Sequence, residues 1–432
     1  MRNRSKVLIA VGAAFAVLAG LWALIAPGQL VKYPNHVDKT VVAGGKFSLA
    51  VNPSTGAPLS KPQVLPLTIH RRLRVVSSTG SQAVVKEDDL EQIGTLPQQD
   101  VQQQYVIDRS TLKNVAGGEA YTYAPANHVN RSPAYSINLP FATASGPYQV
   151  WKNELGRSYT FRQQGATVSR DGLKLIPFQG EVSDVPAQTD YLATLNPLGH
   201  LPTQTTIGQL TPQLRALGID PAQLRTVLLP QLTASDRAAI GSALTRPIPL
   251  RYVVSAKTRL LVEPTTGAIV SLDRVNESLG VQPQLGGLSA IATVLGKSAY
   301  RTNPVIIAAR STLAKLVHSP ATAPVFSYAY GQTPASVADI ASYTKSAANK
   351  ITAVQTTIPL GILLVGVLSA AIGLILWRRE RTGEGEALRG RSRTSQASAP
   401  DATPETAIST VAAPSTGEGE VERPIATPAG RR

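Results

Sequence analysis

The 432-residue sequence contains no cysteine. Without thiols, the chain cannot carry a cysteine nucleophile, cysteine-ligated zinc or an iron–sulfur cluster. A domain of this size can bury enough apolar surface to fold without disulfides. The five histidines also lie far apart in the sequence: His36, His70, His128, His200 and His318. The sequence therefore predicts no metal site and no cofactor.

Charge is absent from two apolar runs of 20 residues, Val7–Ala26 and Ile358–Trp377. As helices, they would each span about 30 Å, the thickness of a bilayer core. Neither contains the ionisable side chains that mark ion paths, so we expect them to anchor rather than conduct. The alternative for the first run is a cleaved signal peptide. Its length, with Leu24 and Pro27 around the best cleavage site, favours an uncleaved signal-anchor.

Basic residues lie on one side of each run. Arg2, Arg4 and Lys6 precede the first run, and Arg378, Arg379 and Arg381 follow the second. Because such residues concentrate on the cytoplasmic side, we expect a multi-pass plasma-membrane protein with both termini inside. Residues 1–6 and the tail, 378–432, would then be cytoplasmic. Residues 27–357 would form an extracytoplasmic domain.

The tail is rich in small, polar and charged residues and cannot bury a core, so we expect it to be disordered. Thr403 and Thr406 are candidate phosphorylation sites within it. The alternative, which we favour, is a tail that only adds solubility.

The segment 27–357 carries 30 Lys and Arg against 19 Asp and Glu, a net charge of +11. The predicted topology directs this basic excess outward, towards the anionic lipids, glycolipids and polymers of an envelope. Nucleic acid is the usual partner of so basic a chain, but an extracytoplasmic placement argues against it.

Short apolar or β-branched runs separated by turn residues dominate from residue 38 to about 190. Long helical segments do not alternate with them, so the pattern favours an antiparallel over a parallel sheet. Leucines at helical spacing between about 208 and 244 predict a small inserted helical module. The predicted fold class is α+β, in which two transmembrane helices, 7–26 and 358–377, flank a mainly antiparallel β domain.

The last outer segment, about 335–356, is predicted to form a helix that continues into the second apolar run. One face of it carries Val337, Ile340, Thr344, Ala347, Ile351 and Val354. This seam suits packing on the chain's own domain, which we favour, or self-association into a homo-oligomer.

Small residues recur within both apolar runs, where they let helix backbones approach closely. They are Gly12, Ala16 and Gly20 in the first run and Gly366, Ala370 and Gly373 in the second. We interpret them as candidate helix-packing positions, either between the two runs or between two copies of the chain.

The sequence lacks the motifs of common hydrolases and nucleotide-binding enzymes. Ser110–Lys113 and Ser342–Lys345 match the Ser-x-x-Lys of penicillin-interacting enzymes, but the companion motifs are missing. We therefore predict that the chain is not an enzyme.

One acidic cluster consists of Glu87, Asp88, Asp89 and Glu91. It lacks the alternation and the glycine of a calcium-binding loop. We interpret it as a charged surface turn.

His70, Arg71, Arg72 and Arg74 form the sharpest local feature. On a strand, Arg72 and Arg74 would share a face with His70, while Arg71 would point the other way. Such cations could bind a lipid phosphate or an acidic sugar. The alternative, which we favour, is an edge strand protected by positive charge.

Several strand-and-turn motifs follow one another between the apolar runs. They are Asp108–Thr111, Asn138–Phe141, Tyr148–Trp151, Asp171–Phe178 and Val262–Val270. With these motifs and the two apolar runs, residues 4–380 resemble the actinobacterial PorA family. The resemblance implies a mycolic-acid-type envelope and supplies no catalytic residues, and the family's name implies a porin. Ser110, Thr111 and Leu112 depart from the family's usual Asp-Arg-Thr-Gly turn.

These observations predict a non-enzymatic envelope protein whose basic domain binds or organises lipids, glycolipids or other proteins. A pore-forming oligomer is the first alternative. An envelope sensor that signals through the tail is the second.

Overall fold

The computed structural model describes residues 2–52, 58–195, 201–206, 226, 229–318 and 322–391. Helices α1 (Arg2–Leu30) and α9 (Ile358–Arg391) lie at the two ends of this part. Most of the chain forms one compact unit, Val11–Leu368. The ends of α1 and α9 form a second unit, which contains Ala10 and Ser369.

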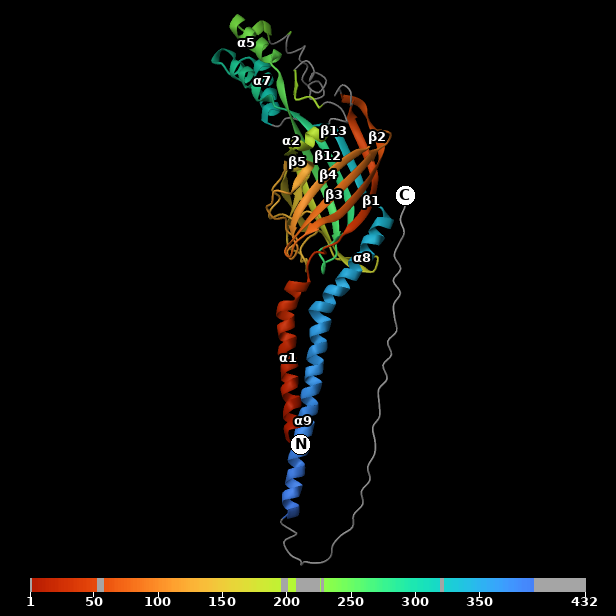
Figure 1. Ribbon diagram of the computed structural model, residues 1–432. Coiled ribbons are helices and arrows are strands. Elements are labelled where there is room, and N and C mark those ends of the chain that lie inside the picture. Colours follow the sequence, from red (N-terminus) through yellow and green to blue (C-terminus); the bar gives the residue numbers. More distant parts are fainter. Residues whose placement is uncertain are drawn as a thin grey trace, which may run out of the picture. The chain divides into compact units, whose positions relative to one another are not determined.

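The larger unit is built on a 13-stranded sheet whose strand pairs are all antiparallel (Figure 1). Its main order is β5-β4-β3-β2-β1-β13-β12-β11-β9-β7-β6, with β10 beside β11 and β8 beside β9. The strands are β1 (Asp38–Val51), β2 (Pro58–Ser78), β3 (Gln82–Ile93), β4 (Gln99–Asp108), β5 (Tyr121–His128), β6 (Tyr148–Lys152), β7 (Arg157–Gln163), β8 (Val168–Arg170), β9 (Leu173–Pro186), β10 (Gln204–Thr205), β11 (Ile248–Val262), β12 (Ile269–Pro283) and β13 (Ala323–Gln332). The mainly antiparallel β domain predicted from the sequence is thus confirmed.

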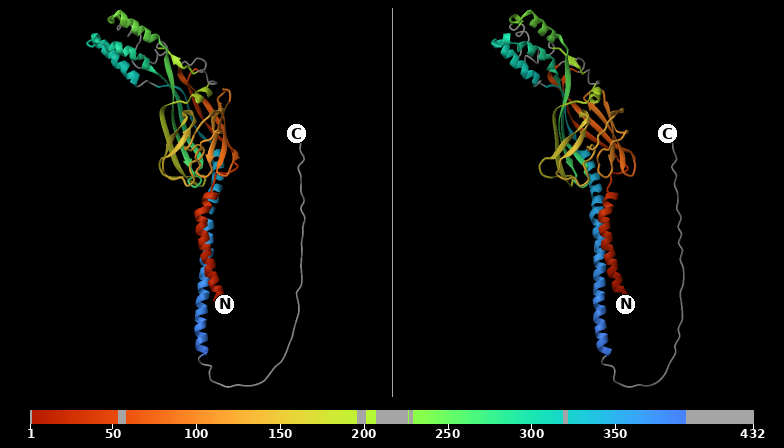
Figure 2. Two further views of the ribbon diagram at one scale, coloured as in Figure 1. Left: turned by 60° about the vertical axis from the view of Figure 1, so that its left-hand side comes forward. Right: turned by 90° about the vertical axis from the view of Figure 1, so that its left-hand side faces the viewer.

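The sheet is strongly curled (Figure 2), and the strands at the two ends of its order are β5 and β6. Arg131, which is only 1% exposed, joins them. Its guanidinium donates to the carbonyl oxygens of Gln104 and Tyr121 and to Asn153 Oδ1. It also lies 4.5 Å from the ring centre of Tyr105. We call this curled sheet the barrel.

The barrel has two distinct ends. Helix α1 leads into β1 at one end, and α8 (Pro334–Thr352) leaves β13 at the same end, because β1 and β13 are antiparallel. We call it the helix end and the opposite one the far end. Buried apolar side chains cluster at both ends, from the strands and from the segments that connect them. At the far end they include Phe47, Leu67, Leu279 and Phe326, and at the helix end Ile107, Leu112, Leu139, Leu260 and Val262.

Helices gather at the far end. They are α2 (Thr189–Thr194), α5 (Ala234–Thr245), α6 (Ser289–Leu295) and α7 (Pro304–His318). The predicted insertion at 208–244 lies largely outside the described residues. Its final helix, capped by the Thr233 hydroxyl, is α5. The sequence patterns did not predict α6 and α7.

Helix α8 continues through a π-helical turn, Ala353–Thr357, into α9. The predicted continuous helix is therefore confirmed. Val337 and Ala341 on α8 are buried against Leu261 and Val270 of the sheet. The favoured interpretation of the seam, packing on its own domain, agrees with these contacts.

Two helical segments, Ser5–Leu30 and Pro334–Arg379, are long and apolar enough to cross a membrane. Their small residues differ in role. A Cβ on Gly366 would lie 2.9 Å from the carbonyl oxygen of Gly12 and 3.4 Å from Ala16 N, and one on Gly373 would lie 3.0 Å from Ser5 O. Ala370 is half-buried, whereas nothing lies within 4 Å of a Cβ on Gly20.

Helix α9 extends to Arg391, past the predicted boundary at Trp377. Residues 392–432, with Thr403 and Thr406, lie outside the described residues.

Two turns at the helix end of the barrel share one geometry. The Asp108 carboxylate accepts hydrogen bonds from the amides of residues 110 and 111, and Glu263 does the same for residues 265 and 266. Each turn then places a residue at positive φ, Leu112 at 63° and Gly267 at 69°. The acidic side chain at the start of each turn thus satisfies the amides that the turn leaves unpaired.

Gly267→Ala is expected to lower the free energy of unfolding by about 2–3 kcal/mol. The new Cβ would lie 2.0 Å from the carbonyl oxygen of Leu139. Gly165→Ala is the matched control, because Gly165 has φ +82° but nothing within 4 Å, so only about 1 kcal/mol of strain is expected. Chemical denaturation of the full chain in detergent measures both values. Equal losses would mean that the contact with Leu139 does not constrain the turn.

Candidate functional site

A cavity of about 630 Å³ lies inside the barrel and extends to its helix end. Its lining there includes Leu30, the last residue of α1, and Lys32, which follows that helix. Three residues of α8 also line it: Tyr343, Ala347 and Ile351. The cavity therefore extends to the elements that connect the barrel to the two candidate membrane helices.

Apolar side chains line much of the cavity near the helix end. They include Val37, Val41, Leu73, Ile137, Phe141, Leu260, Ile269, Leu272 and Ile340. Because these side chains come from strands, from the segment that joins β5 to β6 and from α8, the apolar lining surrounds this part of the cavity.

Farther along the strands from the helix end, charged and polar side chains line the interior of the barrel. We call this set the belt: Arg71, Glu87, Asp89, Glu91, Gln103, Tyr105, Lys152, Glu154 and Glu277. Glu87, Asp89 and Glu91 occupy alternate positions of β3, which places all three on its inner face. The predicted surface turn was therefore wrong. A strand with four acidic residues resembles an exposed loop in sequence, and only sheet closure puts three of them inside.

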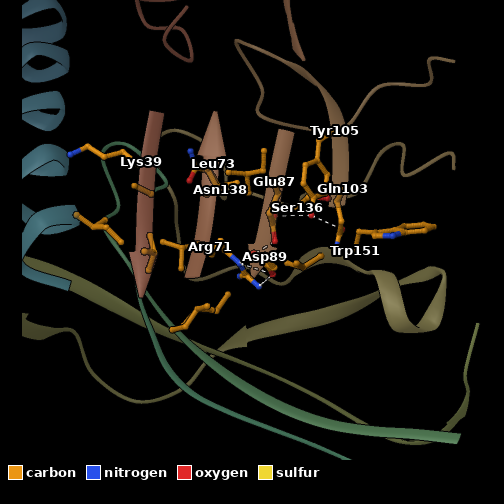
Figure 3. A pocket seen from close by; sticks show the side chains of 18 of the residues that line it. Lys39, Arg71, Leu73, Glu87, Asp89, Gln103, Tyr105, Ser136, Asn138 and Trp151 are labelled. Carbon is orange, nitrogen blue, oxygen red and sulfur yellow. Dashed lines mark hydrogen bonds and ion pairs between the residues drawn. The ribbon is translucent and has the colours of Figure 1, made fainter. Parts of the chain in front are cut away.

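Arg71 pairs with two of these carboxylates (Figure 3). Its Nε lies 3.0 Å from Glu87 Oε1, and its Nη2 lies 2.7 Å from Asp89 Oδ2. The Tyr105 hydroxyl lies 3.0 Å from Glu87 Oε2 and 2.8 Å from Gln103 Oε1. One guanidinium and one phenol thus connect three neighbouring strands, β2, β3 and β4.

Lys152 forms the second charged group of the belt. Its Nζ lies 2.6 Å from Glu277 and 2.9 Å from Glu154. The two carboxylates raise the lysine's pKa well above its usual value and outweigh the effect of burial. Lys152 therefore remains charged inside the barrel.

The belt has more carboxyl groups than its cations neutralise. Burial raises the pKa of Glu87 and of Glu277 to about 7, against the opposing effects of Arg71 and Lys152. The pKa of Glu91 rises to about 8, through burial and the nearby Asp89. Among the described residues, no hydrogen bond or ion pair reaches the Glu91 carboxyl. This group faces the cavity without a protein partner.

The basic run that the sequence singled out has the predicted alternation. Arg71 points into the barrel, whereas His70, Arg72 and Arg74 lie on the outer face. The structure does not gather them into one site: Arg72 pairs with Asp38 at 2.6 Å, and Arg74 with Asp88 at 3.3 Å. Contact of these residues with an anion stays a prediction.

Three lysines near the helix end also line the cavity, and no motif in the sequence predicted them: Lys32, Lys39 and Lys350. Lys39 points towards α8 (Figure 3) and lies 3.0 Å from Asp339 and 5.5 Å from the ring centre of Tyr343. These lysines make this end of the cavity basic, whereas the belt is acidic.

In the part of the chain that the structure describes, no three His, Asp or Glu side chains are arranged to hold a metal ion. The carboxyl groups of the belt are thus spread over the cavity wall.

Comparison with known proteins identifies a family. A family model described as the porin PorA matches residues 4–375. The chain belongs to the PorA porin family. No curated protein matches it. The family assignment and the two candidate spans indicate a membrane protein.

The motifs that carry the PorA resemblance meet at the helix end. Leu139 donates its amide proton to Gly267 O at 2.9 Å, which joins the segment Asn138–Phe141 to the turn between β11 and β12. Asn138, Phe141 and Thr266 line the cavity. The parts of the sequence that resemble the family thus contribute to this end of the candidate site.

The outer face of the barrel is mostly polar. On the described strands, the large apolar side chains that are strongly exposed are Val64, Val76 and Leu90. A β-barrel that spans a membrane instead has a continuous apolar band on its outer face. Among the described residues of this PorA-family chain, most of the strongly exposed large apolar side chains belong to α1 and α9.

Proposed function

We propose that this PorA-family chain is a non-enzymatic protein of the cell envelope that takes the head of a membrane lipid or glycolipid into its barrel. The acyl chains would remain at the helix end. The observation that supports this function best is the cavity, whose apolar part extends to the residues between α1, β1 and α8.

The proposal rests on how the cavity lining changes along the barrel. Apolar side chains and three lysines share the helix end, and the polar belt lies deeper. An amphiphile could place its hydrocarbon, its phosphate and its outermost polar group in that order. The volume of about 630 Å³ falls within the range of ligand sites.

The topology that suits this function has α1 and α9 in the plasma membrane and the barrel outside. The charge-free apolar runs and the basic residues beside them support it. The helix end of the barrel would then face the outer leaflet, from which a lipid head could enter.

Ala347→Trp is expected to weaken binding of a fluorescent phospholipid to the full-length protein in detergent by about tenfold or more, because the indole would fill the helix end of the cavity. Ala338→Trp, on the exposed face of the same helix, is the matched control and should bind like the wild type. Equal binding by the wild type and both variants would place the lipid outside the barrel. Absence of binding in the wild type would end the proposal.

A pore-forming oligomer is the second candidate, which the family name supports. The apolar cluster at the far end, with Phe47, Leu279 and Phe326 almost fully buried, leaves the single barrel a poor conduit. Conductance steps of the full-length protein in planar bilayers, with a dependence on protein concentration, would favour the pore.

A further inference from the structure

We propose that the belt recognises an organic ammonium group, held between the carboxyl groups of Glu91 and Glu277 and the side chains of neighbouring tyrosines. The ammonium would be the outermost group of the lipid head. This inference therefore specifies the ligand of the proposed function and rests on that function. A free alkylammonium ion would present the same chemistry without the lipid.

The first argument is charge. Five carboxyl groups line the belt, and its ion-paired cations are Arg71 and Lys152. Each of these cations already contacts two carboxylates. Glu91 has no partner among the described residues, and Glu277 shares Lys152 with Glu154. A cation in the cavity would therefore pair with carboxyl groups that the protein's own cations leave without a full partner, once these groups lose their protons.

The second argument is the aromatic lining. Tyr123, Tyr191, Tyr328 and Tyr330 line the same cavity. The rings of Tyr123 and Tyr191 are 5.9 Å apart. Aromatic faces next to carboxylates attract ammonium groups through their ring quadrupoles, and they suit alkylated nitrogen better than a hydrated metal ion.

The third argument is an unsatisfied polar group. The hydroxyl of Tyr123 is buried and has no hydrogen-bond partner in the described structure. Burial, and then the nearby Glu154, Glu277 and Glu91, raise the pKa of Tyr123 well above its usual value. This neutral hydroxyl could bond the phosphate or a hydroxyl that adjoins an ammonium group.

Other ligand classes fit the belt less well. The metal ions that carboxylates usually hold need several converging oxygen ligands, and the described carboxylates do not form such a cluster. An anion in the belt would be repelled by its carboxylates. A zwitterionic head suits both ends of the cavity, because Lys32, Lys39 and Lys350 near the helix end could face its phosphate.

Protonation should couple to this binding. Glu91 faces Asp89 on its own strand, Arg71 on β2, Glu277 on β12, Glu154 after β6 and Tyr328 on β13. Its raised pKa, about 8, means that it carries a proton at neutral pH. A cation that binds beside it must displace that proton, so affinity should increase as the pH rises from 6 to 8.

The experiment measures binding of short-chain phosphatidylethanolamine and phosphatidylglycerol to the full-length protein in detergent at pH 8. The ethanolamine lipid is expected to bind about tenfold more tightly. Glu91→Gln should remove most of this preference, because the amide keeps the shape and loses the charge. Glu181→Gln is the matched control, since Glu181 is 53% exposed on the outer face and pairs with Lys257. It should keep the preference.

Tyr123→Phe provides a second variant that keeps the packing and removes only the unpaired hydroxyl. Thermal unfolding of each variant checks that it is folded. If both lipids bind equally well to the wild type, or if Glu91→Gln keeps the preference, the ammonium site is refuted and lipid binding stands. If O-phosphoethanolamine binds but neither lipid does, the ammonium site stands and the proposed function fails. If none of the three binds, both fail.

Discussion

Arg71→Met is expected to lower the free energy of unfolding by about 3–5 kcal/mol, which is typical when one partner of a buried ion pair is removed. Arg71 neutralises Glu87 and Asp89, which are 8% and 4% exposed. Methionine fills a similar volume but leaves both carboxylates without a cation inside the barrel. Denaturation of the full chain in detergent, followed by tryptophan fluorescence, measures the loss.

The neighbouring residue supplies the matched control. Arg72 also pairs with a carboxylate, Asp38, at 2.6 Å, but both side chains are more than 40% exposed. Arg72→Met should therefore leave the free energy of unfolding almost unchanged. The two arginines are adjacent on one strand and both form ion pairs. Comparing the two variants therefore measures how much burial adds to the cost of losing such a pair. Similar losses in both variants would show that the belt is open to bulk water.

The fold could be predicted where a local pattern decides it. Uninterrupted apolar runs identified the two long helices, and alternating β-branched runs identified the antiparallel strands. The buried face of α8 could also be predicted, because Val337 and Thr344 recur at helical spacing. Helices α6 and α7 were missed because Ala, Ser and Thr dilute the apolar periodicity of α6, and Pro304 begins α7 within a loop-like stretch.

The candidate site could not be predicted because it depends on long-range closure of the sheet. Glu87, Asp89 and Glu91 alternate along β3, but the sequence does not say which face is inside. Other members of the belt come from distant segments: Lys152 from β6 and Glu277 from β12. The arginine that joins β5 to β6, Arg131, stands in a polar stretch and carries no local signal. Its burial depends on contacts with Gln104 and Tyr121, on β4 and β5, and with Asn153, which follows β6 at the other end of the sheet order.

The stability of the protein is expected to fall as the pH rises from 5 to 8. In the folded state, the pKa values of Glu87 and Glu277 are about 7 and that of Glu91 is about 8. All three exceed the value of about 4.3 for an unfolded glutamate. The folded chain therefore binds more protons than the unfolded chain in this window, and each carboxyl can cost up to about 1.4 kcal/mol per pH unit.

Groups with lowered pKa values act in a different window. Neighbouring Lys297 and Tyr300 hold the pKa of Asp236 at about 2, and Arg72 lowers that of Asp38. These carboxyls remain ionised in both states above pH 5, so their contribution is lost only under more acidic conditions. The change in stability between pH 5 and pH 8 thus depends on carboxyl groups whose pKa is raised, chiefly those inside the barrel.

Denaturation midpoints at pH 5, 6, 7 and 8 test this trend, and one variant assigns it to the belt. Glu91→Gln removes a titrating carboxyl while keeping its shape, so its stability should fall less steeply with pH than that of the wild type. Glu181→Gln, on the outer face, should follow the wild type. A wild-type stability that is constant or increases over this range would mean that the belt carboxyls are ionised and solvated, and the interior would then be a water-filled channel rather than a closed binding site.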